Sequence, residues 1–330
     1  MFEPGYLALY QSGELKRRAE ALEARLAACD ICPRRCGIDR LKGKRKFCHS
    51  AYLPIVSSVC AHHGEEPVLS GTGGSGTIFL GNCNMRCLYC QNYQISQDPA
   101  GQQSHEVAIH ALAERMLYLQ NELGCHNINF VSPSHFVPQI VKAVLEAVPM
   151  GLRLPLVYNT GGYDAIETIR ALDGIIDIYL PDLRYASNQW ARKLSQAPDY
   201  VEHARAAIKE MYRQVGDLKV DDEGIAQRGL IVRHLILPER MAGSEESLAW
   251  LADEVSPQVT VSIMSQYYPA HRASRVPVLT RKISRSEYQE VVALVERLGL
   301  ENGWLQEMAA AANYLPDFER NGHPFEPVKD

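Results

Sequence analysis

The 330-residue sequence has no apolar run of the roughly 18 residues that a membrane-spanning helix needs. Its N-terminus (residues 1–5) lacks the basic and then apolar profile of a secretory signal peptide. A long basic stretch is also missing and the net charge is −5, so composition gives no sign of nucleic-acid binding. We therefore expect a cytoplasmic protein that binds neither membranes nor nucleic acids.

The sequence also lacks the even set of cysteines that is typical of a disulfide framework. It has nine cysteines, and seven of them lie in two tight groups. This distribution favours metal ligation over disulfide bonding. With 330 residues, of which 22% are charged, the chain is expected to form one barrel-sized domain with an appendage.

One cysteine group, Cys83, Cys87 and Cys90, follows the apolar run 76–80, which predicts a buried strand. Thiolates this close together suit zinc or an iron–sulfur cluster. A structural zinc site has four protein ligands, whereas this loop offers three, and no further Cys or His occurs before His105. A metal centre on this loop would therefore keep one coordination position open.

The spacing Cys-x3-Cys-x2-Cys, with Tyr89 directly before the last cysteine, resembles that of the radical S-adenosylmethionine (radical SAM) enzymes. The resemblance implies that Cys83, Cys87 and Cys90 hold a [4Fe–4S] cluster whose fourth iron binds S-adenosylmethionine, with Tyr89 beside this cofactor. It also implies reductive cleavage to a 5′-deoxyadenosyl radical that abstracts hydrogen from a substrate. Two alternatives remain: a zinc-stabilised scaffold without redox chemistry, and a reduced loop with incidental cysteines.

The other cysteine group lies among turn-forming and basic residues near the N-terminus and consists of Cys29, Cys32, Cys36 and Cys48. Four thiols in about twenty residues suit a structural zinc site or a second iron–sulfur cluster, and free thiols without a metal are a third reading. A helix is predicted over residues 12–28, with Ser12 as its N-cap.

Six apolar runs alternate with six segments of helical periodicity after residue 76. The expected strands span residues 76–81, 127–131, 154–158, 175–180, 229–237 and 259–264. The expected helices span residues 105–123, 136–148, 163–172, 198–215, 244–255 and 284–298. This alternation predicts parallel strands joined by right-handed crossovers.

The pattern resembles the open, partial (β/α)6 barrel of the radical SAM family. We therefore expect an α/β fold with this barrel over residues 71–300. An N-terminal helix and cysteine-rich extension is expected over residues 1–70, and a C-terminal tail over residues 301–330 that packs on the barrel.

Function in parallel barrels gathers at the C-terminal ends of the strands. Asn159 and Thr160, after the third expected strand, resemble the Asp-Thr-Asn-Gly segment of glycyl-radical activating enzymes, with Asn in place of Asp. Asp182 and Arg184, after the fourth, resemble their Asp-Leu-Lys, with Arg in place of Lys. The resemblance implies that the acid helps to fix the carboxylate of S-adenosylmethionine, in some enzymes through a monovalent cation, and that the basic residue is catalytic. A salt bridge at the barrel rim is the alternative.

The remaining strand ends supply further candidates for cofactor binding. Ser132 and Ser134 stand where the family often has a Gly-Gly-Glu-like segment for the amino group of S-adenosylmethionine, and Ser134 is alternatively the N-cap of helix 136–148. Arg233 and His234 alternate on one strand, so one of them points into the barrel, and a buried, paired Arg233 is the alternative to a cofactor contact. Gln266 is expected to contact adenine or the substrate.

Longer phrases across the chain resemble a subfamily described as pyruvate formate-lyase activating enzyme-like or uncharacterised radical SAM proteins. The resemblance implies a ferredoxin or flavodoxin as the electron donor. The substrate is then a protein glycine, as in glycyl-radical enzyme activation, or another macromolecule or small molecule, as in a maturase or biosynthetic enzyme. An eight-cysteine ferredoxin insert, which many activating enzymes carry, is absent between Cys90 and helix 105–123.

Overall fold

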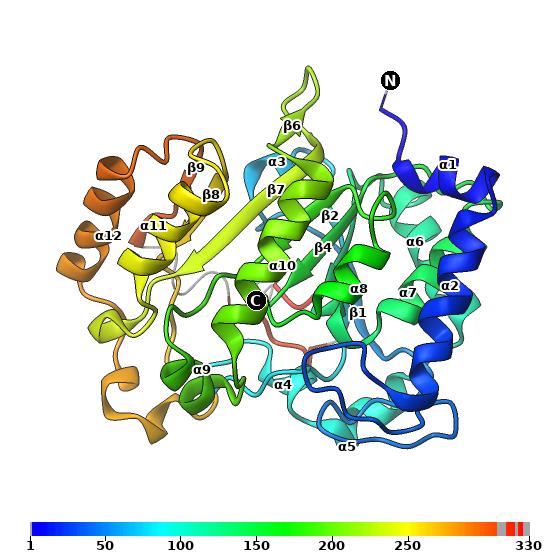
Figure 1. Cartoon of the computed structure of the whole chain (residues 1–330), viewed down its shortest axis with the longest axis horizontal. Coiled ribbons are helices and arrows are strands. Elements are labelled where there is room, and N and C mark those ends of the chain that lie inside the picture. The colour runs from blue at the N-terminus through cyan, green and yellow to red at the C-terminus, as the bar shows by residue number, and fades with distance from the viewer. Residues whose placement is uncertain (1, 309–314, 321–322, 326–330) are drawn as a thin grey trace.

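The computed structural model describes residues 2–308, 315–320 and 323–325. Within these ranges the chain forms a nine-stranded sheet in the order β1-β2-β3-β4-β5-β7-β8-β9, with β6 paired to β7 and helices covering the sheet (Figure 1). The strands are β1 (Val56–His62), β2 (Ser75–Leu80), β3 (Ile128–Val131), β4 (Leu156–Thr160), β5 (Ile178–Pro181), β6 (Lys219–Val220), β7 (Ala226–Leu235), β8 (Thr260–Met264) and β9 (Gly303–Leu305).

Seven consecutive strands of the sheet run parallel, namely β2, β3, β4, β5, β7, β8 and the edge strand β9. The first six correspond one to one with the six expected strands, and the predicted α/β fold with an open, partial barrel is confirmed. The main crossover helices are α6 (Ile109–Asn121), α7 (Val137–Ala147), α8 (Ile166–Ala171), α10 (Tyr200–Val215), α11 (Ser244–Glu254) and α12 (Arg285–Arg297).

Shorter helices and turns complete the described structure. The helices are α1 (Gly5–Gln11), α2 (Glu14–Ala24), α3 (Pro67–Ser70), α4 (Tyr93–Ser96), α5 (Pro99–Gln102) and α9 (Asn188–Ser195). The 3-10 segments are η1 (Arg25–Ala28), η2 (Gln103–His105), η3 (Pro133–His135), η4 (Pro238–Arg240), η5 (Ala273–Arg275) and η6 (Pro277–Thr280). None of the helices in the described part of the chain has the length and apolarity needed to span a bilayer.

Two strands at the ends of the sheet were not expected. β1 belongs to the N-terminal segment and pairs antiparallel with β2, whereas β9 belongs to the C-terminal segment and pairs parallel with β8. Both are edge strands with partly exposed residues, so neither has the continuous apolar run that identified the central strands. The flanking segments therefore add strands to the sheet on both sides.

The predicted helix over residues 12–28 is found as α2 followed by η1, but Ser12 is not its N-cap. Gly13 holds that position with φ 77°, and the Ser12 hydroxyl donates to the carbonyl of Leu9. Glycine adopts this left-handed conformation without strain, so the chain turns sharply there and α2 packs beside α7 (Figure 1).

A buried arginine joins the N-terminal segment to the barrel. Arg40 is 1% exposed and donates to the carbonyls of Ala51 and His135, the latter at 2.7 Å. The hydrogen bond to His135 crosses to the turn after β3. Charged groups are buried in this way only when hydrogen bonds compensate them, so the extension and the barrel are held together by a polar contact as well as by apolar packing.

Two parts of the C-terminal segment, residues 315–320 and 323–325, lie against β1 and β2. The Phe318 ring contacts Phe79 edge to face at 5.1 Å, and the Phe325 ring stacks on His62 at 4.1 Å between ring centroids. The remainder of the expected tail, residues 309–314, 321–322 and 326–330, lies outside the described residues.

Asp177 is a buried carboxylate at the opposite end of the barrel from the cysteine loop. It lies just before β5 and accepts the backbone N–H groups of Gly5, at 3.2 Å, and Leu156, at 3.1 Å. Burial raises the pKa of Asp177 from 3.8 to about 7. Folding therefore favours the protonated form of this side chain.

This shift predicts that acidic pH stabilises the fold through Asp177. The folded protein binds the proton more tightly than the unfolded chain, so the free energy of unfolding falls as the pH rises from about 4 to about 7. A shift of this size corresponds to about 4 kcal/mol. Urea unfolding across this pH range should show that Asp177→Asn becomes more stable relative to wild type as the pH rises.

The control is Asp173→Asn, at a partly exposed ion pair, which should show no such gain in stability. If the free energy of unfolding of wild type and of Asp177→Asn depends on pH in the same way, the assignment to Asp177 is contradicted.

Candidate functional site

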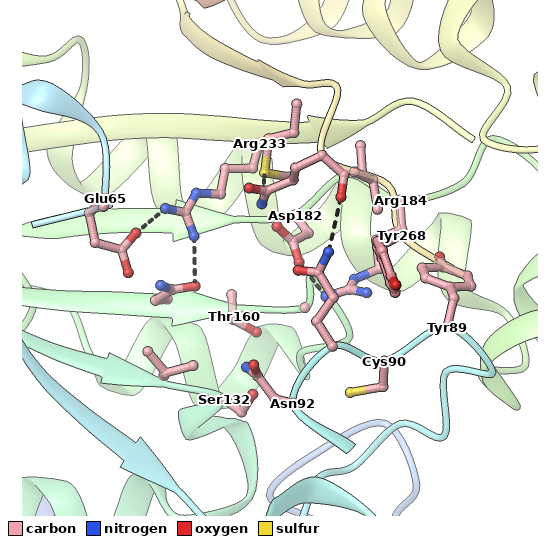
Figure 2. A pocket seen from close by; sticks show the side chains of 18 of the residues that line it. Glu65, Tyr89, Cys90, Asn92, Ser132, Thr160, Asp182, Arg184, Arg233 and Tyr268 are labelled. Carbon is pink, nitrogen blue, oxygen red and sulfur yellow. Dashed lines mark hydrogen bonds and ion pairs between the residues drawn. The ribbon is translucent and has the colours of Figure 1, made fainter. Parts of the chain in front are cut away.

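A pocket lies at the C-terminal ends of the parallel strands, between the cysteine loop and the loop after β8 (Figure 2). Nine of the residues singled out from the sequence line it: Tyr89, Cys90, Ser132, Asn159, Thr160, Asp182, Arg184, Arg233 and Gln266. Parallel strands bring their C-terminal ends to one edge, which is why residues spread over most of the chain meet here.

The cysteine loop places its thiols on and beneath one wall of this pocket. Cys90 lines the pocket, Cys87 is 7% exposed, and Cys83 is half-buried. Burial raises the pKa of the Cys83 thiol, and burial together with the charge of Cys87 raises the pKa of Cys90 to about 12. The thiols are close enough to act on one another electrostatically.

The donor set of the cysteine loop suits an iron–sulfur cluster. Three neighbouring soft thiols on one loop are the ligand type of such a cluster, which spans several atoms. In the described part of the chain, no group of three or more His, Cys, Asp or Glu side chains is arranged to hold one metal ion. Cys83, Cys87 and Cys90 are the residues that would hold it.

Arg86 and Asn84 fix the conformation of the cysteine loop. Arg86 donates to the carbonyls of Cys83, at 2.8 Å, Met85, at 2.9 Å, and Phe47, at 2.6 Å. The Asn84 amide donates to the carbonyl of Tyr163 at 2.7 Å. Because these bonds satisfy carbonyls that no regular structure uses, the loop can be rigid without being a helix or strand.

Each thiol of the loop also has a hydrogen-bond partner. Cys83 Sγ accepts the N–H of Met85 at 3.4 Å, and Cys90 Sγ lies 3.2 Å from the hydroxyl of Ser96. Cys87 Sγ accepts from the Ser195 hydroxyl at 3.0 Å and lies 3.6 Å from Arg184 Nη1. Among the three loop cysteines, Cys87 is thus the one whose sulfur has both a hydroxyl and a guanidinium as hydrogen-bond donors.

Asp182 and Arg184 lie side by side at the end of β5, as their equal parity predicted, and form an ion pair (Figure 2). The guanidinium of Arg184 lies between this carboxylate and Cys87. Its Nε is buried and has no hydrogen-bond partner among the described residues. An uncompensated donor of this kind at a pocket wall is available to a ligand.

Ser132, Ser134 and Thr160 differ in what they offer to the pocket. Ser132 lines it in the left-handed conformation, φ 59° and ψ 51°, which is uncommon for a residue other than glycine. Ser134 does not line it, because its hydroxyl contacts Thr160 Oγ1 at 3.1 Å. Ser134 is not the N-cap of α7 either, since Phe136 holds that position. Thr160 donates to buried Asp164 at 2.6 Å, so its hydroxyl is already engaged.

Arg233 points toward the pocket whereas His234 faces the helices, which confirms the predicted alternation. The Arg233 guanidinium pairs with both Glu65 and Glu66, at 2.7 Å from Nε to Glu66 Oε1, and contacts Asn159 Oδ1 at 3.5 Å. His234 is fully buried and contacts the carbonyl of Leu183 and the hydroxyl of Ser244; burial lowers its pKa to about 4.

Sequence reasoning did not assign the two carboxylates around Arg233. They belong to the run of two histidines and two acids at residues 62–66. In the structure these acids pair with Arg233 on β7, 167 residues away for Glu66. The paired Arg233 is therefore the alternative that the geometry supports, with one more negative than positive charge in this cluster.

Gln266 lines the pocket from the loop after β8. Its backbone carbonyl accepts from the side chain of Gln91 at 3.0 Å, and its side-chain carbonyl accepts from Gln306 at 3.0 Å. Tyr267 and Tyr268 lie beside it in the pocket wall. The Tyr267 ring packs edge to face on Tyr89 at 5.7 Å.

The N-terminal cysteines form a second thiol group close to the first. Cys29, Cys32 and Cys48 are buried and Cys36 is half-buried. Burial and the neighbouring charge of Cys48 raise the pKa values of Cys32 and Cys36, and Cys29 also acts on both. Four mutually close thiols fit a metal centre in their chemistry, although they are not arranged to hold a single ion as they stand.

Arg34 lies between the two thiol groups. It donates to the carbonyl of Asn84 at 3.0 Å, its guanidinium lies 3.6 Å from the centre of the Phe47 ring, and it interacts electrostatically with Cys32 and Cys83. The N-terminal cysteine segment is therefore packed directly on the cysteine loop.

No protein-family model matches the sequence. An uncharacterised protein of Methanocaldococcus jannaschii is 26% identical over 275 residues, which cover 83% of this chain and 75% of the relative. A second uncharacterised protein of the same organism is 32% identical over 93 residues, which cover 24% of this chain and 27% of that protein.

Two solved structures were also matched. One is TYW1 with a lysine-pyruvate adduct bound, with a TM-score of 0.42 and 10% identity over 68% of this chain and 74% of that one. The other is HydG, a maturase of the [FeFe]-hydrogenase, with a TM-score of 0.46 and 11% identity over 69% of this chain and 50% of that one.

The ion pairs of Arg233 with Glu65 and Glu66 predict a structural role for this arginine. Arg233→Met leaves Glu65 and Glu66 buried without a counter-charge, and we expect it to lower the free energy of unfolding by about 3–5 kcal/mol. Adding Glu66→Gln should recover part of the loss. Arg297→Met, at an exposed ion pair, is the control and should cost less than about 1 kcal/mol. Urea unfolding of wild type and the three variants measures these effects, and an Arg233→Met variant as stable as the control would contradict the structural role.

Proposed function

We propose that this chain is a radical SAM enzyme that holds a [4Fe–4S] cluster on Cys83, Cys87 and Cys90. The observation that carries the proposal is the position of three mutually close thiols, buried or half-buried, on one loop at the wall of the strand-end pocket. When bound, the reduced cluster supplies the electron for reductive cleavage of S-adenosylmethionine, which generates the radical that abstracts hydrogen from the substrate.

The residues of the chain provide binding, orientation and exclusion of water. With three protein ligands, a bound cluster would keep one iron free to take a further ligand, and Cys90 lines the pocket. Asp182 and Arg184 provide a carboxylate and a partly unsatisfied guanidinium at its wall, suited to the amino and carboxylate groups of an amino acid. Tyr89, Asn159 and Gln266 supply flat and polar surface for the remainder of the cofactor.

A monovalent cation is not needed beside Asp182. In this chain the Arg184 guanidinium already pairs with Oδ2 of that carboxylate, so it can take the place of a bound cation. The replacement of Lys by Arg, with its planar and permanently charged fork, accounts for this arrangement. We therefore propose that Arg184 supplies the positive charge at this position.

The proposed reaction requires an electron donor and a substrate with a reactive C–H bond. A low-potential ferredoxin or flavodoxin is the electron donor that such a cluster requires. The substrate is a C–H bond of a protein glycine, as in glycyl-radical enzyme activation, or of another macromolecule or small molecule. We also propose the activating-enzyme-like assignment, from the sequence resemblance, and a cytoplasmic location, from the absence of a long apolar run in the sequence.

Anaerobic reconstitution with iron and sulfide tests the proposal against the zinc-stabilised scaffold. A radical SAM enzyme should become brown, bind about four irons at the cysteine loop, and form 5′-deoxyadenosine from S-adenosylmethionine after reduction with dithionite. Protein that stays colourless and retains zinc at both cysteine groups would support the scaffold.

Single replacements should show which thiols hold the cluster. Cys83→Ala, Cys87→Ala and Cys90→Ala are each expected to abolish 5′-deoxyadenosine formation, because losing one of three ligands leaves the cluster unstable. Cys125→Ala, at a buried cysteine outside both groups, is the matched control and should keep activity. A loop variant that retains full cluster content and cleavage would refute the assignment of that residue.

Replacing Asp182 or Arg184 should affect the binding of S-adenosylmethionine and not the assembly of the cluster. Asp182→Asn and Arg184→Ala are expected to retain the cluster but to weaken S-adenosylmethionine binding, by about 2 kcal/mol or roughly thirty-fold for loss of a two-pronged contact. Arg184→Lys keeps the charge without the fork and should lie between wild type and Arg184→Ala. Equilibrium binding and 5′-deoxyadenosine formation measure the effect; unchanged affinity and rate in both variants would identify the pair as a structural salt bridge.

We further propose that Cys29, Cys32, Cys36 and Cys48 hold a structural metal, zinc or a second cluster. Since bound metal contributes directly to folding, Cys32→Ser and Cys36→Ser should lower stability or yield more than cleavage per folded molecule. A variant with Cys83, Cys87 and Cys90 all replaced should still contain about one zinc or a residual cluster by metal analysis. Neither metal in that variant would exclude a ligation role for the N-terminal thiols.

A further inference from the structure

A continuous line of buried hydroxyl groups ends on the sulfur of Cys87. The Tyr89 and Tyr185 hydroxyls lie 2.5 Å apart, the Tyr185 and Ser195 hydroxyls 2.6 Å apart, and Ser195 Oγ lies 3.0 Å from Cys87 Sγ. All four side chains are buried, with Tyr185 and Ser195 at 0% exposure. Water therefore does not compete for these hydrogen bonds.

Backbone contacts fix the position of this hydroxyl chain. Ser195 is the last residue of α9, and its carbonyl accepts the N–H of Arg86 at 2.9 Å. The carbonyl of Leu194 accepts the N–H of Leu88 at 2.8 Å. The end of α9 is thus paired with the cysteine loop on both sides of Cys87, so the Ser195 hydroxyl is held against this sulfur.

A metal-bound Cys87 determines the direction of every hydrogen bond in the chain. A ligating cysteine is a thiolate, which only accepts, so Ser195 must donate to it. Ser195 then accepts from Tyr185, and Tyr185 accepts from Tyr89, because each hydroxyl has one proton to donate. The three donors point the same way, an arrangement in which each bond strengthens the next.

We propose that Ser195 and Tyr185 are positioning residues that set the reduction potential of the cluster through Cys87. The inference rests on the proposed function, because it requires a cluster on this loop. Hydrogen bonds to cluster sulfurs are one of the means by which proteins tune the potential. Donors stabilise the added negative charge of the reduced state and raise the potential, which eases reduction by the electron donor. Tyr89 lines the pocket, so the chain also connects the pocket wall to the cluster ligand.

The direct test is the reduction potential of the reconstituted cluster in the full-length protein without S-adenosylmethionine, followed by electron paramagnetic resonance. The variant with Cys83, Cys87 and Cys90 all replaced serves as the blank, so that any centre on the N-terminal cysteines is subtracted. Ser195→Ala should lower the ratio of reduced to oxidised cluster at a fixed potential about ten-fold, which is about 59 mV for one electron. Tyr185→Phe should shift the potential in the same direction by less, because it acts through Ser195.

Two controls separate this role from a general effect on packing. Ser195→Thr retains the hydroxyl and should keep the potential near that of wild type. Tyr179→Phe removes an equally buried hydroxyl that donates to Gln214 on the helix side of the sheet, and it should leave the potential unchanged. If Ser195→Ala does not fold, the reduction potentials of Tyr185→Phe and Tyr179→Phe can still be compared, and only Tyr185→Phe should differ from wild type.

The outcomes distinguish this inference from the proposed function. A cluster that assembles and has the same potential in wild type, Ser195→Ala and Tyr185→Phe would overturn the inference and leave the proposed function intact. A shift in Tyr179→Phe equal to that in Tyr185→Phe would also overturn it. A wild-type cysteine loop that takes up no iron would refute the proposed function and the inference together.

Discussion

The cost of burying charge determines the arrangement of the strand-end pocket. A charged side chain removed from water loses several kcal/mol unless opposite charges and hydrogen bonds replace its hydration. Arg233 is only 15% exposed at its side chain and meets two carboxylates, and Arg184 meets Asp182 and the sulfur of Cys87. These pairs fix where the pocket wall is charged and leave the Arg184 Nε as an unsatisfied donor.

The same constraint applies to the cysteine loop. Burial raises the pKa values of Cys83 and Cys90, which favours the protonated thiols in the absence of a metal. A thiolate-bound cluster would add negative charge beside the pocket wall. Arg34, Arg86 and Arg184 surround the loop with hydrogen bonds to its backbone or sulfur. This cationic shell is suited to offset the charge of the proposed cluster.

Local patterns in the sequence predicted the parts of the fold that depend on local information. The six central strands have apolar runs long enough to recognise, and period-two alternation correctly separated Arg233 from His234 and placed Asp182 and Arg184 together. The edge strands β1 and β9 lack such runs and were missed. The partners of Arg233 and Cys87 were also missed, because Glu66 is 167 residues from Arg233 and Ser195 is 108 residues from Cys87. No spacing rule reaches across such distances, and only the folded sheet brings these residues together.

The N-terminal segment is better understood as part of the candidate site than as a separate appendage. Arg34 connects its cysteines to Asn84 and Cys83, Arg40 connects it to the turn after β3, and β1 contributes an edge strand beside β2. Glu65 and Glu66, which follow β1, compensate Arg233 in the pocket wall. A metal on Cys29, Cys32, Cys36 and Cys48 would order the segment that carries Arg34. Its binding would therefore stabilise the cysteine loop through this arginine, without contact with the cofactor or substrate.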